Sequence, residues 1–173
     1  MRAESLFTND KNIYWPSEFI DVMNLLTGKN SEGKDTGMGL FPFNTGALVF
    51  AATIGLINNR QREVGPNRKE VLLSTFSGHN FHTRTHSLER YISFIGLLSS
   101  PELDETGQKS LECLRPEREE ELIERFQKYA AGGLEYIAGV IERTGSLSAE
   151  VIVRELLPKK DGEGSAVDLP PLF

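Results

Sequence analysis

Residues 41–62, FPFNTGALVFAATIGLINNRQR, decide the fold of this chain, because an uncharged apolar block ends there abruptly in amides and arginines. The block is too short, and too polar at its ends, to span a bilayer, which needs about 20 predominantly apolar residues. Asn44 or Thr45 can cap a helix whose interior, residues 47–57, is apolar on nearly every face. We therefore predict a buried helix surrounded by others. Its small residues, which let neighbouring helices approach closely, are Ala47, Ala51, Ala52 and Gly55.

Four further helices are predicted around this one. A helix over residues 15–27 has a proline in its first turn and Gly28 after its last. Apolar residues recur at helical spacing over residues 88–98, with Ser87 as the N-cap. The longest helix begins at Pro116 and runs to Gly145, and a last one covers residues 149–157. Inside the longest helix, the pair Gly132 and Gly133 marks either a kink or a close crossing with another helix.

The remaining segments complete an all-α prediction. Residues 68–76, RKEVLLSTF, fit a short helix or a strand, and we favour the helix because the rest of the chain is helical. Residues 28–39 are rich in glycine and charge and are expected to form a flexible loop. The prediction is a single compact bundle of about five to six helices over residues 1–158, followed by an extended tail, residues 159–173. The tail ends in VDLPPLF, which can pack back on the bundle or dock on a partner.

Composition and charge limit the classes of function. The chain has 173 residues and a single cysteine, Cys113, and no apolar leader follows Met1, so we expect a cytoplasmic protein that does not associate with a membrane. The formal net charge is −6. Residues 58–90, however, carry six basic and three acidic residues, a net +3, against −9 for the remainder. This basic window predicts either a solvated surface or a site for a partner. Its basic residues are Arg60, Arg62, Arg68, Lys69, Arg84 and Arg90.

Three histidines in the same window could ligate a metal. His79, His82 and His86 would share one face of a continuous helix, with Glu89 one turn further on, and zinc accepts such ligands. Glycine, serine, asparagine and threonine make this segment a poor helix, so the shared face is not assured. No nucleophile elbow is present, and Cys113 has no histidine beside it in sequence. We therefore expect a protein without catalytic residues or a cofactor.

Two segments resemble a known family. The resemblance lies in residues Phe43, Thr45, Phe50, Ala51, Ala52 and Gly55 of the apolar block, and in Tyr129, Ala130, Gly132, Gly133 and Leu134 of the longest helix. Together these segments resemble the small proteins called DNA phosphorothioation (Dnd) system-associated protein 4, over roughly residues 40–157. Proteins of this kind accompany bacterial systems that replace a backbone phosphate oxygen of DNA with sulfur, and the linked restriction machinery that defends against phage. The resemblance implies no catalytic residue.

These observations lead to three hypotheses of function. The first is a non-catalytic accessory or adaptor protein that binds other proteins of such a DNA-modification or phage-defence system. The second is a DNA-binding regulator or targeting module that uses the basic window, and the third is a metal-dependent enzyme built on the three histidines. Self-association remains open under each hypothesis.

Overall fold

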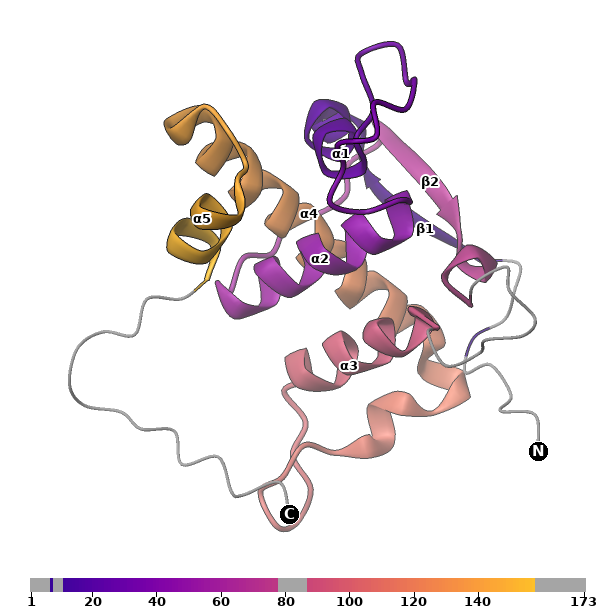
Figure 1. Ribbon diagram of the computed structural model, residues 1–173. Coiled ribbons are helices and arrows are strands. Elements are labelled where there is room, and N and C mark those ends of the chain that lie inside the picture. Colours follow the sequence, from indigo (N-terminus) through magenta and orange to yellow (C-terminus); the bar gives the residue numbers. More distant parts are fainter. Residues whose placement is uncertain (1–6, 8–10, 78–86, 158–173) are drawn as a thin grey trace, which may run out of the picture.

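The computed structural model describes residue 7 and residues 11–77 and 87–157 (Figure 1). Strand β1 (Asn12–Pro16) leads through a 3₁₀ turn (Ser17–Phe19) into helix α1 (Ile20–Thr27). Helix α2 (Asn44–Ile57), strand β2 (Arg68–Leu72), a second 3₁₀ turn (Leu73–Ser77) and helix α3 (Glu89–Ser99) follow. Two short 3₁₀ turns (Leu111–Leu114 and Pro116–Arg118) precede the long helix α4 (Glu119–Thr144). Helix α5 (Ala149–Val151) then continues into a π-helical turn (Ile152–Leu156).

The all-α prediction is wrong, because β1 and β2 pair into a two-stranded antiparallel sheet and make the fold mixed α/β. The register runs from Asn12 opposite Leu72 to Pro16 opposite Arg68. Side chains alternate along β1, so that Ile13 and Trp15 are buried while Tyr14 is only partly covered. The first helix therefore begins at Ile20, after the strand, and the segment that we assigned to a short helix forms β2 and the turn after it.

The crossing of α2 and α4 forms the centre of the molecule (Figure 1). A Cβ atom on Gly133 would lie 1.8 Å from the carbonyl oxygen of Ala51, and one on Gly55 would lie 2.1 Å from the carbonyl oxygen of Tyr129. Real Cβ atoms do not approach that closely, so the two backbones touch where the side chains are absent. Helix α4 continues through its glycines without interruption, and a close crossing, rather than a kink, explains them.

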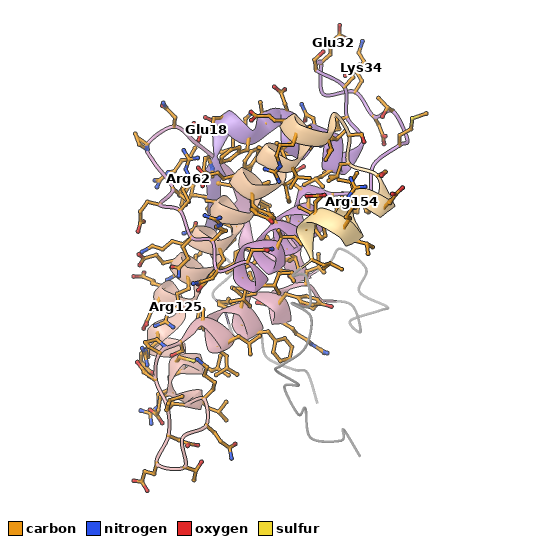
Figure 2. All side chains as sticks on the ribbon, turned by 90° about the vertical axis from the view of Figure 1, so that its left-hand side faces the viewer. Glu18, Glu32, Lys34, Arg62, Arg125 and Arg154 are labelled. Carbon is orange, nitrogen blue, oxygen red and sulfur yellow. The ribbon has the colours of Figure 1, made fainter. Side chains whose placement is uncertain are left out.

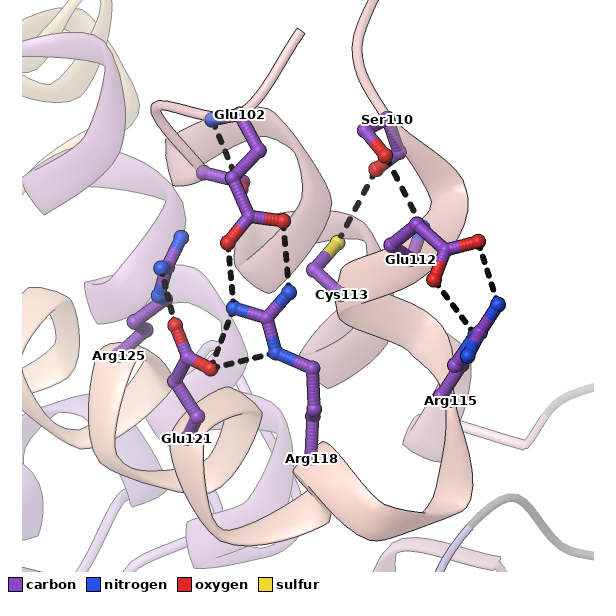
Figure 3. A network of polar contacts seen from close by, with 9 residues as sticks. Glu102, Ser110, Glu112, Cys113, Arg115, Arg118, Glu121 and Arg125 are labelled. Atoms are coloured by element: carbon purple, nitrogen blue, oxygen red, sulfur yellow. Dashed lines mark hydrogen bonds and ion pairs between the residues drawn. The ribbon is translucent and has the colours of Figure 1, made fainter. Parts of the chain in front are cut away.

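Ion pairs join the loop after α3 to the start of α4 (Figure 3). The guanidinium of Arg118 donates to both oxygens of Glu102, at 2.6 Å each, and to Glu121 at 2.8 Å. Arg125 pairs with Glu121 from the next turn of α4. The Arg118 guanidinium lowers the pKa of the Glu102 and Glu121 carboxyls, and these carboxylates in turn raise the pKa of Arg118. The network therefore holds this loop against α4 when the carboxylates are charged.

Candidate binding surfaces

The guanidinium of Arg62 contacts two carboxylates and an aromatic ring of the protein. Its guanidinium pairs with Glu18, before α1, and donates to Glu135 of α4 at 2.7 Å (Figure 2). The same group lies 5.1 Å from the centre of the Phe19 ring. Through these two carboxylates, Arg62 joins α4 to the segment before α1. The carboxylates also offset its positive charge, so Arg62 attracts a negatively charged ligand less strongly.

Arg60, which follows α2, contacts a different part of α4. Its exposed guanidinium stands 5.9 Å from the centre of the Tyr136 ring, and the Tyr136 hydroxyl donates to the carbonyl of Glu155 at 3.0 Å. The neighbouring Asn58 also donates to the C-terminal segment, from its side chain to the carbonyl of Leu156, at 2.9 Å. These contacts place Arg60 where α2 ends beside the last helical segment.

The other residues of the basic window lie on separate elements. Arg68 and Lys69 belong to β2, and Arg90 is exposed on α3. Arg84 and the three histidines of the predicted metal site, His79, His82 and His86, lie outside the described residues. The described arginines and lysine of this window are thus carried by the end of α2, the sheet and α3.

An open cleft of about 840 Å³ lies between the sheet, α1 and the loop that follows α1. Basic and amide side chains line much of it, and the partly exposed Tyr14 and Ile20 contribute apolar surface. The buried side chains of Trp15 and Met23 border it from the core. Lys29 comes from the loop, and Arg68 and Lys69 come from β2, which brings a lysine from outside the basic window beside two of its members. The polar lining is completed by Asn24, Asn44 and Glu70.

The three cations of the cleft have no carboxylate within 4.0 Å among the described residues, unlike Arg62. Arg68 instead stacks on Tyr14, with 3.9 Å between the guanidinium carbon and the ring centre. The ring covers one face of the Arg68 guanidinium, so the N–H groups at the edge of the guanidinium can still donate to an acceptor. The one acid of the lining, Glu70, accepts a hydrogen bond from the Asn12 amide at 3.0 Å.

Hydrogen bonds within the loop that follows α1 shape one wall of the cleft. Gly28, with a φ of 66°, ends α1 in the left-handed conformation that we predicted. Its backbone packs directly on Gly39, since a Cβ on either residue would lie 2.3 Å from a backbone atom near the other. Within the loop, the Asn30 side chain accepts from the backbone N–H of Glu32 and of Lys34. The loop therefore closes on itself at its base. We retain its flexibility as a prediction.

Helix α3 exposes an apolar face that the sequence analysis did not separate from the buried one. Tyr91, Phe94 and Leu98 are 48%, 57% and 55% exposed, and their spacing of three and four residues places them on one side. Ile92 and Ile95 are buried on the other side. The sequence analysis counted Tyr91 and Leu98 among the apolar residues at helical spacing and did not distinguish them from Ile92 and Ile95. The signal we missed is that a surface helix needs one apolar side to pack on the core, so a second apolar side is left exposed.

The described residues contain no group of three or more histidine, cysteine, aspartate or glutamate side chains arranged to hold a metal ion. Cys113 is buried, and its thiol donates weakly to the carbonyl of Ser110 at 3.5 Å. Within the same residues, no helix has the length and apolar character needed to cross a bilayer. Among the described residues, we take the cleft and the exposed face of α3 as the candidate surfaces for recognition.

A comparison with protein families finds a match to DNA sulphur modification system-associated protein 4 over residues 16–168. The chain belongs to this family. The match confirms the resemblance and extends it in both directions, to the segment before α1 and into the C-terminal tail. Searches of curated proteins and of solved structures found no match. Of the residues that carried the resemblance, Gly55 and Gly133 lie at the crossing of α2 and α4, and Gly132 packs on the backbone of Arg60 just after α2, so this part of the pattern describes packing.

Proposed function

We propose that this member of the family is a cytoplasmic, non-catalytic accessory protein that binds another protein of the DNA sulphur modification system, or of the phage-defence machinery linked to it. The observation that carries the proposal is the exposed apolar face of α3, formed by Tyr91, Phe94 and Leu98. Contiguous apolar surface of this kind is a feature of protein interaction sites. The family description places the chain in association with such a system.

The charge of the chain favours a different protein over a second copy. Each copy carries a formal net charge of −6, so pairing two copies brings like charges together. A partner with an apolar groove and a positive net charge would instead be attracted to this chain. The tail that ends in VDLPPLF lies outside the described residues, and its two docking options stay open.

Co-purification from the native host tests the proposal. The tagged chain is recovered at low salt, and the retained proteins are identified by mass spectrometry. We expect a stoichiometric partner from the DNA sulphur modification system with the wild type, and its loss with Phe94→Glu. Val153→Glu is the matched control, because it places the same charge on an exposed apolar position beyond α4 and leaves α3 unchanged.

Two results would overturn the proposal. One is a wild-type chain that emerges alone or only as a self-assembly. The other is a Phe94→Glu variant that folds, as judged by its thermal melt, and still retains the partner in full. Loss of the partner from Val153→Glu as well would also count against α3 as the docking surface.

A further inference from the structure

We propose that the cleft between the sheet, α1 and the loop after α1 binds phosphate groups, carried by a DNA strand or by a nucleotide. This surface is separate from the exposed face of α3, and the inference does not rest on the protein-binding role. Three cations from two elements line it, Lys29 from the loop and Arg68 and Lys69 from β2. They give the cleft a positive charge on a chain whose net charge is −6.

The contrast with other cations of the chain is the first argument. Arg62, Arg118 and Lys128 each contact two carboxylates. The cleft cations contact none among the described residues, although the chain carries an excess of acids. Cations that have no carboxylate beside them keep their attraction for an anionic ligand. The positive charge of the cleft therefore suits an anionic ligand.

The geometry of Arg68 is the second argument. Stacking on Tyr14 at 3.9 Å orients the guanidinium without consuming its N–H donors. A guanidinium held in this way can present two parallel N–H groups to two oxygens of one phosphate. The flanking lysines add point charges, which suit a phosphate group without fixing its orientation.

The size and mixed lining of the cleft are the third argument. Its volume of about 840 Å³ exceeds what a single inorganic anion fills and suits a nucleotide or a short stretch of strand. Asn24 and Asn44 carry amides that can both donate and accept hydrogen bonds. Ile20 and Tyr14, both partly exposed, supply apolar surface for a sugar or a base. A ligand with phosphate, sugar and base groups therefore finds a chemical counterpart for each.

The single tryptophan of the chain makes the test direct. Trp15 is buried and lines the cleft, so its fluorescence reports on a ligand there. The full chain is titrated at low salt with a single-stranded deoxyoligonucleotide, a duplex, ADP and pyrophosphate in separate arms. We expect saturable quenching in at least one nucleic-acid or nucleotide arm, and the tightest arm identifies the source of the phosphate. Affinity is expected to fall as salt rises, because phosphate contacts release counterions.

Charge-removing variants locate the site. The double variant Lys29→Gln with Lys69→Gln is expected to bind about tenfold more weakly and to lower the salt slope for an oligonucleotide by roughly 1.5. Arg90→Gln is the matched control, because it removes a cation of the same basic sequence window from α3. Its affinity is expected to equal that of the wild type.

The outcomes separate cleanly. No quenching at low salt in any arm would overturn the proposal, as would quenching that the double variant leaves unchanged. An equal loss in the double variant and in Arg90→Gln would show that only net charge matters, and that would overturn the cleft as a site. A loss confined to the double variant would support it, whatever the result of the co-purification experiment.

Discussion

Gly133 has a weak helix propensity, but it lies at a position of α4 where there is no room for a side chain. Glycine costs about 1 kcal/mol relative to alanine in a helix interior. At this position the cost is offset, because the backbone of α4 rests on the Ala51 carbonyl and Gly55. The sequence predicted a special role for the glycine pair but left the kink and the crossing as alternatives. Only the placement of α2 against α4 separates the two, since a crossing depends on residues about 80 positions apart.

Replacing Gly133 with alanine is expected to destabilise the fold strongly. The new Cβ would lie 1.8 Å from the Ala51 carbonyl oxygen, so α2 and α4 must separate. Overpacking of this kind costs about 1–3 kcal/mol or more. Urea unfolding followed by circular dichroism measures the free energy of unfolding.

Gly139→Ala is the control for the same helix. Its Cβ would meet only the end of the Arg143 side chain, at 3.6 Å, so the variant should be neutral or more stable by up to about 1 kcal/mol. Equal unfolding free energies for the two alanine variants would contradict the backbone contact.

Arg118→Gln is expected to lower stability more at neutral than at acidic pH. Arg118 holds the pKa of Glu102 and Glu121 below the ordinary value of 4.5, so both carboxylates stabilise the fold above that pH. This stabilisation is lost as the pH falls through their folded-state pKa values. The difference in Tm between wild type and variant should therefore shrink between pH 7 and pH 3. Arg90→Gln, at an exposed arginine of α3, controls for net charge, and a difference that stays constant with pH would contradict the network.

The helices and the strands differ in how far local sequence determines them. Helical periodicity predicted α3 and α4, and an interior that is apolar on nearly every face predicted α2; the structure has all three helices. The end of α1 at Gly28 was also predicted, because glycine favours the left-handed cap. Strand β1 was missed because its five residues alternate too briefly to stand out and Pro16 suggested a helix start. Strand β2 is mostly exposed, so its apolar pattern could not settle a choice that its pairing with β1 decides.

A pair of cysteines tests the register of the sheet. The Leu73 N–H donates to the Lys11 carbonyl, and the Ser17 N–H donates to the Asn67 carbonyl, so alternation places Asn12 opposite Leu72 in a position without hydrogen bonds. Cα atoms at such positions are about 4.5 Å apart, within reach of a disulfide. We expect Asn12→Cys with Leu72→Cys to cross-link under mild oxidation, as measured by mass spectrometry after proteolysis.

The control pairs Asn12→Cys with Val71→Cys, whose side chains point to opposite faces of the sheet. The native Cys113 is buried and does not compete. Efficient cross-linking of the control, or none in the test pair, would show that the register is different.

At the scale of the whole molecule, the candidate sites depend on residues that are distant in sequence. The basic window was visible as a run of charge, but its members have different surroundings. Arg62 is paired with Glu135 of α4, whereas Arg68 and Lys69 line one cleft with Lys29 from the loop after α1. Linear charge counting cannot foresee either result, because carboxylates 44 and 73 positions away pair with Arg62. The exposed face of α3 could have been found, since its apolar residues exceed what one buried side requires.

Hydrogen exchange of the full chain, alone and with the co-purified partner, tests most directly whether α3 is the docking surface. Amide exchange slows where a partner covers a helix and suppresses its local opening. We predict that binding slows exchange in α3, over Glu89–Ser99, while α5 is unchanged. Exchange in α3 that stays the same in the complex, with protection appearing on another surface, would contradict the account.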